Sequence, residues 1–250
     1  MRLTVVGCSG SGPGPDSPAS CYLVEQDGFR LVLDLGNGAL GPLSRYVDPR
    51  AVDAILLSHL HADHCLDACS LMVVHRRQPG PRPGPILLAG PAGTTQRLLA
   101  AADPGAASLS DVFTVTELTA GSRSLGPFQL RLARTNHPVE TYAVRLTAGG
   151  RSLTYSADTG TSPALVALAR DTDLFLCEAS FLDPGPGGEA NPPDLHLTGR
   201  EAGEHAAAAG AGRLLLTHIP LWHDPARTLA EAGGVFDRSE VVRSGSAYDL

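Results

Sequence analysis

The stretch 58–64 is the part of the chain richest in side chains that can bind metal ions. It holds three histidines and one aspartate in the pattern H-x-H-x-D-H. Imidazole nitrogens and carboxylate oxygens together suit zinc, manganese or iron, and no thiol inside the cluster restricts it to softer metals. His59 and His61 alternate along the chain and can reach one metal ion. Asp63 and His64 can reach a second ion once the chain turns. The spacing therefore predicts a metal site rather than a chance grouping of polar loop residues.

Three more side chains of the ligand type each follow an apolar run. His137 comes after the run that starts at residue 128, Asp158 after the run at 152–157, and His218 after the run at 214–217. A strand that ends at such a residue delivers its side chain to the edge of a sheet. Each of the three is a weak signal when it is taken alone.

The elements that must position these residues follow from apolar periodicity and turn signals. An Asp-Gly pair at 27–28 between two β-rich runs predicts a hairpin, and Thr198 with Glu201 predicts a capping box at a helix start. Strands are expected at 3–6, 21–24, 29–33, 54–57, 86–88, 112–118, 128–135, 142–147, 152–156, 174–177 and 214–216. Helices are expected at 66–77, 94–102, 163–170, 198–209 and 225–232. The pattern alone indicates a mixed α/β protein.

Length and composition narrow the class further. The 250 residues fit one large domain or two small ones, and the 43% hydrophobic content is enough for a sizeable core. No run of eighteen apolar residues is present, so we expect no membrane association, and the start of the chain is typical of a strand rather than of a signal peptide. Five cysteines without a C-x-x-C pair favour a reducing cytoplasm as the location.

Charge argues against a broad nucleic-acid surface. The net charge is −7 and the sequence contains no lysine, whereas nucleic-acid binding normally needs a basic stripe. A small anionic substrate held by metal ions stays compatible with this balance.

The stretch 8–18 is rich in glycine, serine and proline and is expected to be a loop. Its glycines suggest a dinucleotide fingerprint, but Pro13, Pro15 and Pro18 prevent the helix that such a fingerprint must open. The loop could still offer backbone N–H groups to a phosphate, and a plain surface turn is an equal alternative.

The H-x-H-x-D-H cluster with the three later ligands resembles the metallo-β-lactamase superfamily of binuclear metallohydrolases. That resemblance implies a single-domain, four-layer αββα sandwich with two pseudo-symmetric halves, about 1–108 and 109–250. It also implies that Asp34, at the end of a strand, supports a ligating histidine from behind, although Asp34 could instead cap a turn. The implied ligands are His59, His61 and His137 for one metal ion, Asp63, His64 and His218 for the other, and Asp158 as the bridge.

Two further residues narrow the resemblance to the phosphodiesterase branch of this superfamily, which includes tRNA 3′-processing endonucleases. Glu178 follows a strand and His196 stands in an H-x-T motif, where the branch uses the histidine as an acid toward the leaving oxygen. His196 could instead merely precede a helix. Glu178, His196 and the ligand Asp63 are the expected catalytic residues, and His196 is also expected to contact the substrate. Five further His and Cys residues are expected to be surface or packing residues: Cys65, Cys69, His75, His205 and His223.

Four stretches resemble atypical bacterial phosphodiesterases that hydrolyse cyclic AMP: 6–11, 14–20, 57–67 and 193–197. One departure separates the chain from the tRNA-processing relatives, which carry a long basic arm between the third-strand histidine and the bridging aspartate. Here only residues 138–157 lie between His137 and Asp158, and they are expected to form a hairpin.

These resemblances predict a phosphodiesterase with two divalent transition metal ions per chain, zinc before manganese or iron. It would convert a 3′,5′-cyclic nucleotide, cyclic AMP, to the 5′-nucleotide. A tRNA 3′-processing endonuclease, another small cyclic phosphodiesterase and a non-catalytic metal or nucleotide sensor are the alternatives. The expected partner is a small cyclic nucleotide rather than tRNA, and a homodimer stays open.

Overall fold

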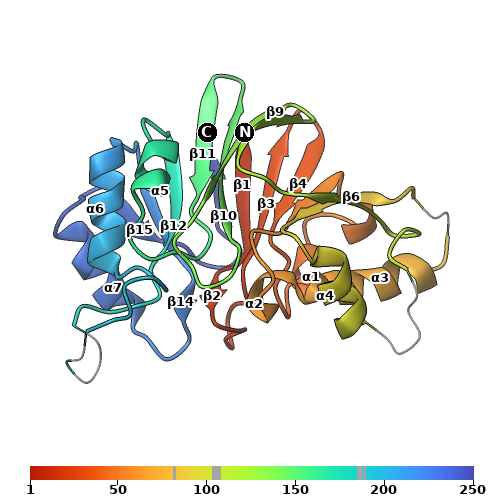
Figure 1. Cartoon of the computed structure of the whole chain (residues 1–250), viewed down its shortest axis with the longest axis horizontal. Coiled ribbons are helices and arrows are strands. Elements are labelled where there is room, and N and C mark those ends of the chain that lie inside the picture. The colour runs from red at the N-terminus through yellow and green to blue at the C-terminus, as the bar shows by residue number, and fades with distance from the viewer. Residues whose placement is uncertain (81–82, 103–107, 185–187, 189) are drawn as a thin grey trace.

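The computed structural model describes residues 1–80, 83–102, 108–184, 188 and 190–250. They form two seven-stranded sheets and one short ribbon (Figure 1). The first sheet has the order β16 (Ala247–Asp249), β1 (Arg2–Gly7), β3 (Cys21–Gln26), β4 (Phe29–Leu33), β5 (Ala54–Leu56), β6 (Ile86–Gly90) and β7 (Phe113–Glu117). The second has the order β15 (Ser239–Val241), β13 (Leu214–Thr217), β12 (Leu174–Glu178), β11 (Arg151–Tyr155), β10 (Tyr142–Ala148), β9 (Phe128–Arg134) and β8 (Gly121–Leu125). The ribbon pairs β2 (Ser9–Gly10) with β14 (Ile219–Pro220) in parallel.

Helices cover the outer face of each sheet. One set lies on the first sheet: α1 (Leu40–Leu43), the 3₁₀ turn η1 (Pro49–Ala51), α2 (Ala62–Cys65), α3 (Asp67–Arg77) and α4 (Thr94–Ala101). The other set lies on the second sheet: α5 (Pro163–Leu168), α6 (Gly199–Ala209) and α7 (Pro225–Gly233). Figure 1 shows the two sets at opposite ends of the molecule with the sheets between them. None of the helices in the described part of the chain has the length and apolar character needed to span a membrane.

Strand alternation explains this layering, because successive side chains of a strand point to opposite faces of its sheet. Leu31 and Leu33 of β4 enter the core between the two sheets, while Val32 packs under the helices of the first sheet. In β12, Leu176 enters the central core and Phe175 packs under the helices of the second sheet. The expected αββα sandwich is confirmed.

Two expectations that rest on short sequence motifs are confirmed. The Asp-Gly hairpin joins β3 to β4 with positive φ at Asp27 and Gly28, and the capping box of α6 is formed by Thr198 and Glu201. Other elements differ: the stretch 8–18 contributes β2, the stretch 58–64 runs into the short helix α2, and α1, β8, β15 and β16 were not expected. The first sheet takes β7 and β16 from beyond residue 108. The division into two halves stays a prediction.

Candidate metal centre

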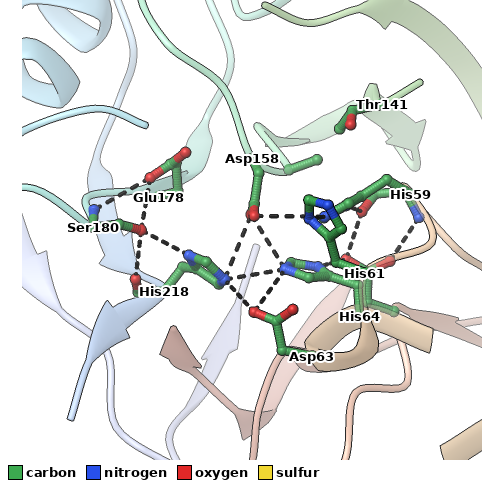
Figure 2. A network of polar contacts seen from close by, with 12 residues as sticks. His59, His61, Asp63, His64, Thr141, Asp158, Glu178, Ser180 and His218 are labelled. Atoms are coloured by element: carbon green, nitrogen blue, oxygen red, sulfur yellow. Dashed lines mark hydrogen bonds and ion pairs between the residues drawn. The ribbon is translucent and has the colours of Figure 1, made fainter. Parts of the chain in front are cut away.

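Strand direction gathers the predicted ligands at one edge of the sandwich. β4 and β5 run parallel in the first sheet, and β11, β12 and β13 run parallel in the second. β9 and β11 are both antiparallel to β10, so β9 points the same way as β11. The carboxyl ends of parallel strands meet at the same edge of a sheet. The predicted ligands at these strand ends therefore lie close together. Asp63 and His64 come from α2, on the side of the first sheet (Figure 2).

The first group consists of three histidines and Asp158. His61 Nδ1 lies 3.1 Å from His59 Nε2 and 3.4 Å from His137 Nε2. His59 Nε2 lies 3.6 Å from Asp158 Oδ2. One donor atom from each of the four residues falls within 4.8 Å of every other. The structure thus brings His59 and His61 next to residues that come about eighty to a hundred positions later in the sequence, His137 and Asp158.

The second group consists of Asp63, His64 and His218. His218 Nε2 lies 3.0 Å from His64 Nε2 and 3.1 Å from Asp63 Oδ2. The other oxygen of Asp158, Oδ1, faces this group at 3.3 Å from His64 Nε2 and 3.6 Å from His218 Nε2. Asp158 therefore turns one oxygen toward each group, and its bridging role stays a prediction.

The donor atoms fit metal ions better than they fit one another. Tetrahedral zinc with bonds of about 2.0–2.1 Å separates two of its nitrogen ligands by roughly 3.3 Å, close to the spacing between the imidazole nitrogens in both groups. Asp158 Oδ1 is buried and makes no hydrogen bond within the described residues. Such an orphaned carboxylate oxygen is costly unless a cation meets it. The His and Asp cluster can therefore hold metal ions.

Electrostatics lead to the same conclusion. Burial lowers the pKa of His59, and burial with the neighbouring His137 has the same effect on the pKa of His61, so both rings present lone pairs near neutral pH. His64 behaves in the opposite way: burial lowers its pKa, but Asp158 and Asp34 outweigh burial and raise the pKa well above its ordinary value. The second group thus draws a positive charge to the point where its donors converge.

A buried carboxylate holds the second group from behind. Asp34 accepts hydrogen bonds from His64 Nδ1 at 2.8 Å, from Ser58 N at 2.6 Å and Oγ at 2.8 Å, and from Tyr155 Oη at 2.7 Å. This contact keeps a proton on Nδ1 of His64 and turns Nε2 toward the centre. Asp34 thus holds His64 from behind, while the role of His64 as a metal ligand stays a prediction. Tyr155, from the second sheet, was missed because nothing near it in sequence marks its partner.

Backbone conformation contributes to the site. Asp34, Ala157 and His218 all adopt positive φ, which is uncommon for residues other than glycine and is concentrated at functional sites. His218 lies between β13 and β14, and its N–H donates to Cys8 O. The glycine-rich stretch therefore has a packing role: β2 pairs with β14, which begins directly after His218.

Gly10 is the contact point of that packing, since a Cβ added there would lie 2.2 Å from His218 O. We expect Gly10→Ala to displace His218, to weaken metal binding by the second group and to destabilise the fold by about 1–3 kcal/mol, the usual cost of overpacking. Gly12→Ala is the matched control, because a Cβ at Gly12 would meet nothing within 4 Å. Thermal unfolding and metal content measured on both variants check this. Equal metal content in both would contradict the packing role.

Glu178 and His196 meet beside the two groups. His196 Nδ1 donates to Glu178 Oε1 at 2.9 Å, and the His196 ring lies 5.5 Å from the ring of His137 and 5.6 Å from that of His218. One nitrogen of His196 falls within 4.8 Å of donor atoms of Asp158 and His218. Burial lowers the pKa of His196, but the charge and hydrogen bond of Glu178 raise it to about 9. The ring can therefore carry a proton at the edge of the centre.

The other histidines lie apart from the centre. His205 is buried, accepts from Ser162 N at 3.0 Å and donates to Glu201 O at 2.7 Å, which satisfies both ring nitrogens. His75 is buried on α3, and His223 is half-buried. Ser180 was missed by sequence reasoning, yet it contacts both Glu178 and His218. The sequence signal that could have identified Ser180 is its position two residues after Glu178, which ends β12.

Comparison with known proteins agrees with this geometry. The family model described as "Beta-lactamase superfamily domain" matches residues 29–219. The chain is 46% identical over 257 residues to an uncharacterized protein of Mycobacterium leprae, covering 100% of this chain and 89% of that one. It is 30% identical over 264 residues to the probable metallo-hydrolase YhfI of Bacillus subtilis, covering 100% of both.

Two further comparisons are with a crystal structure and with a ribonuclease. The crystal structure of YhfI, a metallo-β-lactamase fold protein, superposes with a TM-score of 0.86 at 28% identity and covers 99% of both chains. A ribonuclease Z of Myxococcus xanthus is 29% identical over 289 residues, covering 93% of this chain and 92% of that one. The chain therefore belongs to the β-lactamase superfamily and is a metallo-hydrolase of the metallo-β-lactamase fold.

Proposed function

We propose that the protein is a binuclear metal-dependent phosphodiesterase that hydrolyses 3′,5′-cyclic nucleotides, converting cyclic AMP to 5′-AMP. The observation that carries the proposal is the pairing of Glu178 with His196 beside two donor groups that share Asp158. The donor groups are those of a hydrolytic metal centre, and the protonated histidine suits a reaction whose leaving group is an alkoxide.

Two metal ions per chain are proposed, with zinc first and manganese or iron as alternatives. His59, His61 and His137 would hold one ion, Asp63, His64 and His218 the other, and Asp158 would bridge them. Divalent ions at such sites neutralise charge on phosphoryl oxygens and lower the pKa of water. The mixture of imidazole and carboxylate without thiolate fits all three metals.

The remaining steps fall to the side chains of the chain itself. His196 would donate its proton to the 3′-oxygen as the bond to phosphorus breaks, and Glu178 keeps the ring oriented through Nδ1. Phe181 packs edge-on against the His196 ring, with centroids 5.2 Å apart, and limits its rotation. General acid catalysis of this kind is needed for a poor leaving group such as a sugar hydroxyl.

Size and charge favour a small substrate. Residues 138–157 are occupied by the turn after His137 and the β10–β11 hairpin, which closes at Gly149 and Gly150. No basic arm is therefore present in that stretch. The net charge of −7 without lysine removes the long-range attraction that a polyanion requires. The five cysteines are free, which fits the cytoplasm, where cyclic nucleotides occur.

A tRNA 3′-processing endonuclease is the second candidate. The similarity to a ribonuclease Z over 93% of this chain favours it, and so does the Glu178–His196 pair, which resembles that branch. The acidic composition and the short 138–157 segment count against it.

One metal-loaded preparation assayed on cyclic AMP, bis(p-nitrophenyl) phosphate and unprocessed tRNA separates these functions. We expect hydrolysis of cyclic AMP and of the reporter, with little cleavage of tRNA. Efficient trimming of tRNA with cyclic nucleotides left intact at millimolar concentration would replace the proposal with the endonuclease. Metal binding without turnover of any of the three would favour a sensor.

A further inference from the structure

We propose that Ser180 is a positioning residue that orients His218 toward the metal centre and completes the hydrogen bonding of Glu178, so that one hydroxyl serves both the second donor group and the His196 acid. This inference rests on the proposed function for the roles of His218 and His196. Ser180 is 2% exposed and lies between Glu178 and His218 in Figure 2.

Hydrogen-bond chemistry fixes the direction of each contact. Ser180 Oγ lies 2.7 Å from His218 Nδ1, 2.9 Å from Glu178 Oε2 and 2.8 Å from His218 O. A carboxylate oxygen and a carbonyl oxygen can only accept, and we assign the single hydroxyl proton to the charged carboxylate of Glu178, which is the stronger acceptor of the two. The lone pairs of Oγ then accept from the ring, and the proton of neutral His218 must sit on Nδ1.

That assignment leaves the other nitrogen of His218 free to bind a metal ion. With the proton on Nδ1, Nε2 presents its lone pair at the point where it lies 3.0 Å from His64 Nε2 and 3.1 Å from Asp63 Oδ2. The outer partner of a ligating histidine commonly sets its tautomer in this way. Ser180 thus does for His218 what Asp34 does for His64.

The same hydroxyl completes the environment of Glu178. Oε1 accepts from Thr159 N at 2.7 Å and from His196 Nδ1 at 2.9 Å. Oε2 accepts from Ser180 N at 3.2 Å and from Ser180 Oγ at 2.9 Å. All four acceptor sites of the buried carboxylate are therefore used, and the Glu178 side chain has one orientation in which it can hold His196.

Removing the hydroxyl has a specific consequence. In Ser180→Ala the buried Nδ1–H of His218 has no acceptor, so the proton moves to Nε2 or the ring turns toward another partner. Either change removes the lone pair from the second donor group. We expect zinc affinity at one of the two sites to fall by roughly 10–100-fold, the usual effect of losing an outer partner. The other site should keep its affinity.

The experiment titrates zinc into metal-free wild type, Ser180→Ala, Ser180→Thr and Ser162→Ala in competition with a chelator, and follows thermal unfolding of each. Ser162→Ala is matched, because Ser162 is also buried and caps α5 through Leu165 N, away from the metal centre. We expect one weakened site in Ser180→Ala, recovery of most of the affinity in Ser180→Thr, which keeps a hydroxyl, and two normal sites in Ser162→Ala.

Three outcomes would overturn the inference: two sites of normal affinity in Ser180→Ala, an equal loss in Ser180→Thr, or an equal loss in Ser162→Ala. The last two would assign the loss to packing or to general destabilisation. Zinc binding is read without any substrate. A wild type that binds two zinc ions but hydrolyses no cyclic nucleotide would therefore refute the proposed function and leave the Ser180 test intact.

Discussion

Asp158→Ala is expected to remove nearly all activity and to leave at most one metal ion bound per chain. Its two oxygens face different donor groups, and the side chain is buried between them. The loss of affinity should exceed the roughly 10–100-fold that follows from removal of an outer partner, because a direct ligand to both groups disappears. Elemental analysis after zinc loading and gel filtration measures the result.

Asp173→Ala is the control for this variant. Asp173 lies at the opposite end of the same strands, where it pairs with Arg151 at 3.0 Å on the protein surface. We expect this variant to keep both metal ions and its activity. Full metal occupancy and turnover in Asp158→Ala would contradict the bridging role and with it the binuclear centre.

His196→Ala should reduce turnover of cyclic AMP by roughly 10²–10⁴-fold, the usual scale of general acid–base catalysis, with normal metal content. The reduction should be much smaller for bis(p-nitrophenyl) phosphate, because nitrophenolate leaves without protonation. Steady-state rates on both substrates measure the difference. The contact with Glu178 supplies the reason, since it holds the His196 ring through Nδ1 beside Asp158 and His218.

Two outcomes would give His196 another role. Equal losses on both substrates would make it a binding or structural residue. Loss of a metal ion would make it a ligand, because one of its nitrogens lies within 4.8 Å of donor atoms of Asp158 and His218. Phe181→Leu is the companion variant: it loosens the ring packing, leaves the hydrogen bond to Glu178 in place and should lower turnover only modestly.

The pH dependence should follow the protonation of His196. Burial lowers its pKa, and Glu178 more than compensates and raises it to about 9. The acid form is therefore complete below this pH and is lost as pH rises through about 9. Turnover of cyclic AMP should fall on the alkaline side, while turnover of the nitrophenyl substrate should not show this limb. Parallel profiles of the two substrates would contradict an acid role for His196.

The parts of the site that could be predicted from sequence are those that lie next to recognisable strand ends. His137, Asp158 and His218 each follow an apolar run, so the strand that buries the run also delivers the ligand. Tyr155, Gly10 and the contact of Ser180 with His218 could not be assigned roles in this way, because the partner lies far away in the sequence in each case. Their roles depend on which strands are neighbours, and the pattern of one strand says little about its neighbour.

The same limit applies to the fold. β4 and β12 bury apolar residues on both faces and read as continuous apolar runs, which is why they were expected. β15 and β16 are three-residue strands with partly exposed side chains, and β16 joins the first sheet only through pairing with β1. The short helix α2 was not expected either, and it packs so closely on Gly36 that a Cβ added there would lie 2.0 Å from Asp63 O.

The most direct test of the proposed chemistry is hydrolysis of cyclic AMP by the metal-loaded protein in water enriched in oxygen-18. Attack of water at phosphorus with departure of the 3′-oxygen predicts 5′-AMP that carries one heavy oxygen on the phosphate and none on the ribose. Mass spectrometry of the product and its fragments measures this. Formation of 3′-AMP, label on the ribose, or no turnover at millimolar cyclic AMP would contradict the account.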